Sequence, residues 1–183
     1  MKRCAWATTP LMIEYHDGEW GEPTHDDRVL FEFVLLEGAQ AGLSWDTVLR
    51  KRERYRDVFE AFDPKRVARF TERDVTRLMK DDGIIRNRAK IQSAIGNAKA
   101  FIAVQNEFGS FDRYLWGYVD RKPVVRRPRS TTDIPATSPL SERLSKDLRK
   151  RGFRFVGSTI CYAYLQAVGV INDHLASCFK SRK

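Results

Sequence analysis

The eight residues from 29 to 36, VLFEFVLL, constrain the fold more than any other stretch of this chain. Wound as a helix they are apolar on nearly every side, so the helix has to lie at the centre of the protein, covered all round. Asp26 or Asp27 is placed to cap its start, and Gly42 can stop it after residues 37–41. The sequence therefore predicts a core helix that other elements surround.

The rest of the chain is predicted to form short helices that pack around this core helix. Polar caps, prolines and glycines delimit the amphipathic segments, and no alternating run is longer than a few residues. The predicted helices cover residues 45–59, 64–70, 72–80, 89–102, 111–118, 139–152 and 160–170, with a final helical turn at 173–178. Residues 1–25 are expected to be irregular. We expect an all-α protein of about eight to ten helices, folded as one compact domain over residues 1–183.

The charge balance indicates a polyanionic partner. The chain carries 33 Lys and Arg against 24 Asp and Glu, a net charge of +9, which favours nucleic acid and, more weakly, an anionic membrane surface. No apolar stretch approaches the ~20 residues that span a bilayer, and no signal-peptide core follows Met1, so we expect a cytoplasmic protein. The basic, proline-containing segment 119–137 predicts a surface loop that either contacts DNA or only connects two helices.

Residues 71–103 predict two helices joined by a basic turn. Gly83 is expected to end the first helix in the left-handed conformation, which disfavours residues with a Cβ atom. From there to the start of the second helix the chain contributes Arg86, Arg88 and Lys90 and no acid. With the backbone N–H groups of the helix start, these cations predict a seat for a phosphate. The alternative is an ordinary helical hairpin with a solvated basic face.

Two pairs of cysteine and histidine lie at opposite ends of the chain. Cys4 and His16 are near the start, and His174 and Cys178 are spaced so that a helix would place both on one face. Two thiolates and two imidazoles suit a tetrahedral zinc ion, which would tie the chain ends together. Buried thiols and ordinary polar histidines are the alternative. Cys161 lies in an apolar helix and is expected to be a core residue.

Glu37 is a carboxylate on an apolar stripe of the central helix. Positions 30, 33, 34, 37 and 41 recur at helical spacing, so the Glu37 side chain should point the way its apolar neighbours point. A buried carboxylate needs a partner, either an arginine or a ligand in a pocket. Four aromatic residues pack in the core or line such a pocket, where a nucleobase would stack on them: Trp6, Tyr15, Trp20 and Trp45.

Six ordered sequence blocks resemble those of the bacterial 3-methyladenine DNA glycosylase I family, and the basic turn resembles the helix-hairpin-helix of the DNA glycosylase superfamily. The blocks are RCAW at 3–6, YHD and EWG at 15–21, LEG and QAGLSW at 36–45, GIIR at 83–86, KRGF and FVG at 150–157, and INDH at 171–174. They cover essentially the whole chain. The resemblance implies the helix-hairpin-helix glycosylase fold, with one structural zinc ion that joins segments 1–25 and 172–183 through Cys4, His16, His174 and Cys178.

The resemblance also implies a base pocket. In it Glu37 and Tyr15 would hydrogen-bond the adenine edge and Trp45 would stack on the ring, with Trp6 and Trp20 nearby. The expected reaction is monofunctional, hydrolytic excision of 3-methyladenine, released as the free base. This lesion is cationic and its bond to the sugar is already weak, so extrusion and capture of the base are the main requirements. We predict that Glu37 is the catalytic residue and that its anion selects the cationic base.

The DNA contact that the resemblance implies has two parts. Gly42 and Leu43 would approach the gap left by the flipped base. The hairpin would hold the DNA backbone through Gly83, Ile84, Ile85, Arg86, Asn87, Arg88 and Lys90. The expected partner is double-stranded DNA that contains alkylated adenine, bound by a monomer associated with the nucleoid.

Three positions depart from the superfamily pattern. Ile85 stands where a second hairpin glycine is usual. Gln105 and Asn106 lie near the place of the usual catalytic aspartate, and Glu107 is only a weak substitute. Asn87 occupies the place of the lyase lysine, which argues against a Schiff-base enzyme. Two other functions stay open at this point: a glycosylase for another lesion, and a DNA-binding module that releases no base.

Overall fold

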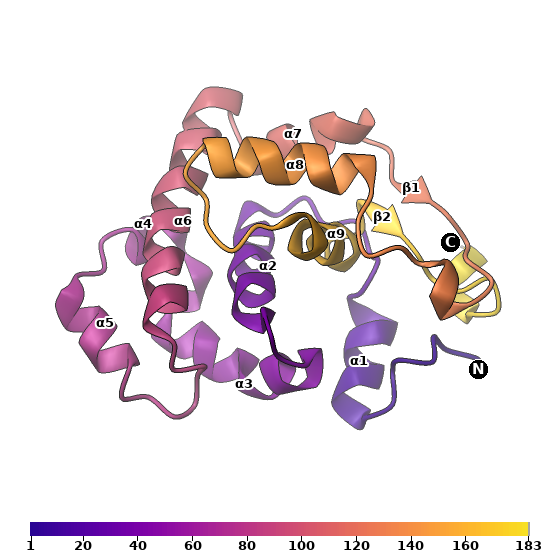
Figure 1. Ribbon diagram of the computed structural model, residues 1–183, viewed down its shortest axis with the longest axis horizontal. Helices are drawn as coiled ribbons and strands as arrows, with labels where there is room; N and C mark the ends of the chain where they lie inside the picture. The colour runs from indigo at the N-terminus through magenta and orange to yellow at the C-terminus, as the bar shows by residue number, and fades with distance from the viewer. Residues whose placement is uncertain (183) are drawn as a thin grey trace.

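Helix α2 (Asp27–Gln40) is the central element of the protein, as its apolar run predicts. In the computed structural model, which describes residues 1–182, α2 is buried without interruption from residue 30 to residue 39. The Asp26 carboxylate caps the helix by accepting hydrogen bonds from the N–H groups of its first turn. Figure 1 shows α2 in the middle of the molecule, with α6, α8 and α9 around it.

Helices form nearly all of the regular structure within residues 1–182, which confirms the predicted all-α fold. The other α-helices are α1 (Pro10–Gly18), α3 (Trp45–Val58), α4 (Pro64–Val67), α5 (Glu72–Leu78), α6 (Arg88–Phe108), α7 (Phe111–Trp116), α8 (Pro139–Lys150) and α9 (Ser158–Ala167). The 3-10 helices are η1 (Glu60–Phe62), η2 (Gly117–Val119), η3 (Thr131–Asp133) and η4 (Phe179–Arg182). Strands β1 (Val124–Val125) and β2 (Ile171–Asn172) form one short parallel pair. Within the same residues, no helix is both long and apolar enough to cross a membrane.

The two ends of the chain differ most from the prediction. Segment 1–25 is irregular only on either side of α1, which begins where Thr9 caps it and Pro10 occupies its first turn. This start signal is as strong as those of the helices that were predicted. At the other end, residues 173–178 form a loop after β2 instead of a helical turn, and η4 begins only at Phe179. The expected C-terminal segment 172–183 ends in Lys183, which lies outside the described residues.

Gly83 is needed for a different reason from the predicted one. It is not among the residues with positive φ, so it does not end α5 in the left-handed conformation. Instead, a Cβ atom at this position would lie 2.5 Å from Cγ of Arg54 in α3. The close approach of α3 to the hairpin turn therefore excludes a side chain at position 83.

The basic segment 119–137 lies on the surface, as predicted, but it is tied down at several points. Strand β1 pairs with β2, and the Ala176 N–H donates to the Pro128 carbonyl oxygen over 2.8 Å. The Arg126 guanidinium donates to the Tyr162 hydroxyl over 2.7 Å. Figure 1 shows the segment running past β2 and the C-terminus before the chain enters α8. The segment is thereby fixed beside the C-terminal loop that carries His174 and Cys178.

Candidate functional site: an aromatic hollow and a buried Cys/His cluster

A hollow of about 370 Å³ opens between α1, α2, α3, α9 and the segment around η3. This volume lies within the range of ligand pockets, about 300–1,000 Å³. The structure brings all five predicted pocket residues to its wall, although they come from three helices and two loops. The wall consists of Trp6, Met12, Tyr15, Trp20, Glu37, Gln40, Trp45, Thr131, Ile134, Ala163 and Gln166.

Glu37 lies on the wall of this hollow without a countercharge. Its side chain comes from α2, and only 4% of the residue is exposed. Among the described residues no arginine or lysine pairs with it, so the interpretation of Glu37 as a structural salt bridge is wrong. Because burial disfavours the charged form, the pKa of the Glu37 carboxyl rises to about 8. Near neutral pH the carboxyl therefore holds its proton more often than an exposed glutamate does.

Three buried polar atoms of the hollow have no hydrogen-bond partner in the protein. They are the Tyr15 hydroxyl, Oε2 of Glu37 and Nε1 of Trp45. Only one other buried side-chain polar atom within residues 1–182 shares this property, Oδ1 of Asp173. Buried polar groups in proteins are almost always paired, so three unpaired ones on one wall indicate a site built for a polar ligand.

The aromatic rings of the hollow contact one another edge-on or at an angle. Trp6 and Trp20 meet edge-to-face with ring centroids 5.0 Å apart, and Tyr15 lies 5.4 Å from Trp45 at 48°. The Phe33 ring stacks with the Trp45 ring, with the two ring centroids 6.4 Å apart. Burial raises the pKa of the Tyr15 hydroxyl well above its usual value, so the group stays protonated and can donate a hydrogen bond.

An ion-pair network joins α3 to α2 and to Glu19, the residue that follows α1. The Arg52 guanidinium in α3 donates two hydrogen bonds to the carboxylate of Glu19, next to Trp20, and one to Glu32 in α2. It also lies over the Phe33 ring, 5.3 Å from the centroid. Arg52 is thus already paired with Glu19 and Glu32, and no ion pair to Glu37 is found among the described residues.

Several wall residues were not predicted from the sequence. Gln40 follows Glu37 by three positions on α2 and so shares its face, a signal that was present in the spacing. Ala163 and Gln166 are related in the same way on α9. Thr131 and Ile134 come from the basic segment, and no local pattern indicates that this segment reaches the hollow.

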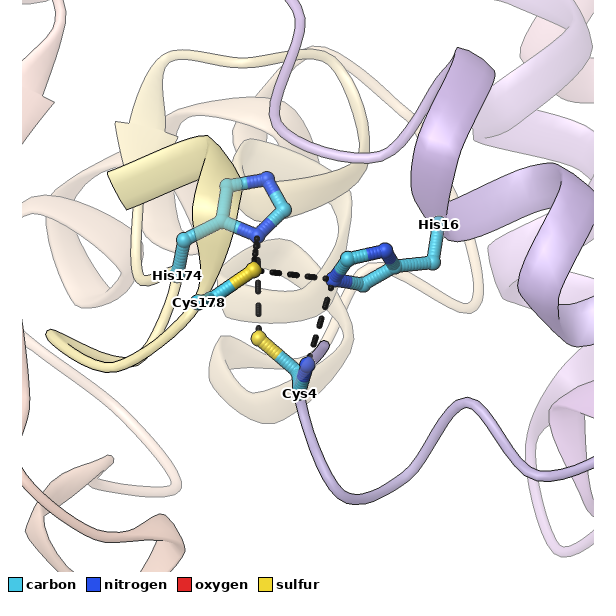
Figure 2. Close-up of side chains that lie close together, drawn as sticks. All are labelled: Cys4, His16, His174 and Cys178. Atoms are coloured by element: carbon cyan, nitrogen blue, oxygen red, sulfur yellow. Dashed lines mark hydrogen bonds between the residues drawn. The ribbon is translucent and has the colours of Figure 1, made fainter. Parts of the chain in front are cut away.

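The four predicted metal ligands meet at one buried point. Figure 2 shows Cys4 and His16 facing His174 and Cys178, with their donor atoms turned toward one another. Sγ of Cys178 lies 3.5 Å from Nε2 of His16 and 3.6 Å from Nδ1 of His174, and Sγ of Cys4 lies 3.6 Å from the same Nδ1. All four ligand atoms lie within 4.8 Å of one another. The group is able to hold a metal ion.

The outer nitrogens of both imidazoles are held by oxygen atoms. Nδ1 of His16 lies 2.7 Å from the Asp17 carboxylate, and Nε2 of His174 lies 3.0 Å from the Trp20 carbonyl oxygen. These contacts orient the other ring nitrogen of each histidine toward the sulfur atoms, the usual arrangement around a metal. Burial lowers the pKa of His174 to about 4, so this imidazole is neutral at neutral pH and has a free lone pair. Gly21 is required here, because a Cβ atom would lie 2.9 Å from Nε2 of His174.

The hairpin and the segment after α2 expose some of their predicted DNA-binding residues. Arg86 is exposed and has no ion pair among the described residues, whereas Arg88 pairs with Glu72. The Asn87 side chain caps α6 by accepting from the Lys90 N–H, 3.1 Å away. Ile84 is buried, and the Ile85 N–H donates to a buried tyrosine. Gly42 has φ +80° and is followed by Leu43, which is 43% exposed.

The residues near the superfamily's aspartate position do not reach the hollow. The Gln105 amide donates to the Asp27 carboxylate over 2.7 Å. The Glu107 carboxylate pairs with Arg151 over 2.7 Å and is not part of the wall. Glu37 is thus the carboxylate that the described residues place in the hollow.

The chain is similar to known proteins over nearly its whole length. Residues 5–181 match the methyladenine glycosylase family. The chain is 50% identical to DNA-3-methyladenine glycosylase 1 of Escherichia coli strain K12 over 179 residues, which are 97% of this chain and 96% of that protein. A crystal structure of 3-methyladenine DNA glycosylase I superposes with a TM-score of 0.95 at 51% identity, over 97% of this chain and 98% of the other. The Staphylococcus aureus enzyme, solved to explain its recognition of 3-methyladenine, superposes with a TM-score of 0.96 at 36% identity, over 100% and 98%.

Proposed function

This chain belongs to the methyladenine glycosylase family, and on that premise we propose that it excises 3-methyladenine from alkylated DNA. The observation that carries the proposal is the aromatic hollow with its three unpaired polar atoms. A flipped base would enter this hollow and supply the missing partners. A protein that only binds the DNA backbone has no need for such a site.

We assign complementary roles to three residues of the wall. The lesion is a cation, and Glu37 is a buried carboxyl without a countercharge. The bound base would therefore provide the positive charge that the Glu37 carboxylate lacks. Entry of the cation would lower the pKa of Glu37 and stabilise its anion. The Tyr15 hydroxyl is the further partner for the polar edge of the base, and the Trp45 ring provides stacking worth about 1–3 kcal/mol.

The proposed reaction is hydrolysis. The bond between the base nitrogen and C1′ of the sugar breaks, its electron pair stays with the base, and the positive charge of the base is neutralised. Water adds to C1′ and loses a proton. No lysine lies on the described wall of the hollow, so the site offers no amine for a covalent intermediate and supports a monofunctional enzyme. We propose Glu37 as the catalytic residue, because it is the carboxylate that the wall contributes.

We further propose that the substrate is double-stranded DNA and that the protein acts on it as a monomer, in the cytoplasm at the nucleoid. The exposed Arg86 and the free N–H groups at the start of α6 would hold a backbone phosphate. Leu43, exposed beyond the end of α2, would fill the gap that the extruded base leaves. The net charge of +9 favours such a complex.

For the Cys/His cluster we propose a single structural zinc ion. Zinc bonds of about 2.3 Å to sulfur and 2.0–2.1 Å to nitrogen, in tetrahedral geometry, separate the two kinds of ligand by roughly 3.6 Å. The observed sulfur–nitrogen distances of 3.5 and 3.6 Å fit this value. Four protein ligands leave no open position for a substrate. The ion would therefore contribute folding free energy by tying the chain ends together.

The test is release of bases from methylated duplex DNA, separated by chromatography. The wild-type protein is expected to release 3-methyladenine. Glu37→Gln should lower kcat/KM by about 10- to 100-fold, since a hydrogen bond to a charged group is worth roughly 1.5–3 kcal/mol. Glu107→Gln is the matched control and should retain activity, because its carboxylate pairs with Arg151 outside the hollow.

Three results would argue against the proposal. Release of other bases without 3-methyladenine would assign a different lesion. Salt-dependent binding with no free base would indicate a DNA-binding module. An unchanged rate in Glu37→Gln would remove Glu37 from the mechanism.

A further inference from the structure

Lys90 does not point away from the protein as a free cation of the hairpin. It is the third residue of α6, and its side chain reaches back across the interface to the end of α2. Its ammonium group donates to the carbonyl oxygens of Ala39 over 2.8 Å and Ala41 over 2.6 Å. These carbonyls belong to the last turn and the cap of α2, where helical partners are missing and a cation is favoured.

The position of these two carbonyls matters because the chain continues from them directly into Gly42 and Leu43. Lys90 therefore fixes the start of the segment that ends in the exposed leucine. The same lysine belongs to the first turn of α6, the helix start that is proposed to hold the phosphate. One side chain thus connects the two parts of the predicted DNA contact.

The other end of this segment is held against the hairpin through α3. Lys51 donates to the Asp82 carbonyl oxygen over 2.7 Å, and the hydroxyl of Tyr55 accepts from the Ile85 N–H over 3.3 Å. Arg54 pairs with Asp81 over 2.8 Å and packs against Gly83. In Figure 1, α3 lies between the α5–α6 turn and the lower end of α2. The segment 41–44 is consequently bracketed by two anchors to the same hairpin.

We infer that Lys90 is a positioning residue that holds Gly42 and Leu43 at a fixed distance from the backbone-binding hairpin, so that docking on DNA and insertion of Leu43 occur together. The inference rests on the proposed function, because it assigns Lys90 a part in extruding the damaged base. It replaces the expectation that Lys90 is a phosphate ligand: two of the three ammonium donors already bind carbonyl oxygens.

The experiment compares Lys90→Met with the wild-type full-length protein in four measurements. Insertion is followed by the fluorescence of 2-aminopurine placed beside an abasic-site analogue in a duplex. Base release is measured on methylated duplex DNA, backbone binding by the salt dependence of affinity for undamaged duplex, and pocket integrity by the quenching of tryptophan fluorescence with free 3-methyladenine. In Lys90→Met we expect the 2-aminopurine signal to fall and base release to drop by about 10- to 100-fold, because a misplacement of about 1 Å can cost that much.

Three further variants serve as controls. Lys99→Met removes the same charge from an exposed position of the same helix and should change none of the four measurements. Arg86→Ala should reduce the slope of log affinity against log salt by about one, as expected for a lost phosphate contact, whereas Lys90→Met should leave the slope unchanged. Lys90→Arg keeps donors for both carbonyls and should restore most of the insertion signal.

The inference is overturned if Lys90→Met reduces the salt slope as Arg86→Ala does, because Lys90 would then be a phosphate ligand. Loss of free-base binding in Lys90→Met would also overturn it, because the contact would then stabilise the whole protein. Normal insertion in Lys90→Met would have the same consequence. If the wild-type protein releases no base, the proposed function fails, but the 2-aminopurine signal still tests the role of Lys90.

Discussion

The Cys/His cluster and the aromatic hollow are two buried sites that share α1. The histidine nitrogens of the cluster have partners, whereas three buried polar atoms of the hollow have none. In the cluster, both histidines have an oxygen partner on their outer nitrogen, and their inner nitrogens face the two sulfur atoms. In the hollow, Tyr15, Glu37 and Trp45 each leave a buried polar atom unpaired. Neighbouring residues in sequence belong to different sites: Tyr15 lines the hollow, and His16 faces the cluster.

The difference indicates what each site does. A closed set of four ligands satisfies a metal ion completely and leaves nothing for a substrate, so its effect is on stability. Unpaired buried groups destabilise the folded protein until a ligand supplies their partners, so their presence indicates binding. Changes in the cluster should therefore act mainly on folding, and changes in the hollow mainly on ligand affinity and rate.

The largest effect is expected from Cys178→Ser. Loss of one thiolate should release the metal and lower the free energy of unfolding by roughly 4 kcal/mol or more, the stabilisation that a ligand gives at about 1,000 times its Kd. Elemental analysis and denaturant unfolding check this. Cys161→Ala is the matched control: Cys161 is buried away from the cluster, so metal content should stay at that of the wild type. Full metal retention in Cys178→Ser would contradict the role of Cys178 as a ligand that holds the metal.

An intermediate effect is expected from Glu37→Gln on stability, and its size depends on pH. The Glu37 carboxyl has a pKa of about 8 in the folded protein against 4.5 as its ordinary value. Below pH 4.5 the group is protonated in both states, so its ionisation does not affect the free energy of unfolding. Between pH 4.5 and 8 the unfolded chain gives up the proton more readily, so wild-type stability falls as pH rises.

The glutamine variant lacks this penalty. Its advantage in unfolding free energy over the wild type should grow from near zero at pH 4 to a few kcal/mol at pH 8, since each pKa unit corresponds to about 1.4 kcal/mol. Urea unfolding of both proteins across this range measures the difference. A constant difference would mean that Glu37 is not the unpaired group described above.

The smallest effect is expected from Trp45→Phe. The substitution keeps an aromatic ring but replaces the indole with a smaller one, so part of the stacking area is lost. Affinity for free 3-methyladenine should fall about 2- to 10-fold, a part of the roughly 1–3 kcal/mol that stacking on one base contributes. Fluorescence titration or calorimetry measures it. Trp6→Phe is the comparison variant, because Trp6 lines the wall without the stacking role of Trp45, and its affinity should change less.

Much of the fold was predictable because it depends on local chemistry. The apolar run around Phe33 identifies the central helix, and Asp26 and Ser44 cap α2 and α3 where their side chains predict. The direction of Glu37 follows from its spacing along α2. Local signals were also misinterpreted: Gly83 is a glycine because Arg54 packs against it and not because of its φ angle.

The sequence by itself determined the all-helical class, the core helix and the identities of the chemically useful side chains, because periodicity, caps and residue chemistry act over a few neighbouring positions. Only the tertiary structure decided that Thr131 and Ile134 complete the hollow and that Lys90 binds the end of α2. It also decided that His174 and Cys178 reach the N-terminal segment from a loop. These contacts join residues far apart in the chain, and the packing of whole helices sets their distances.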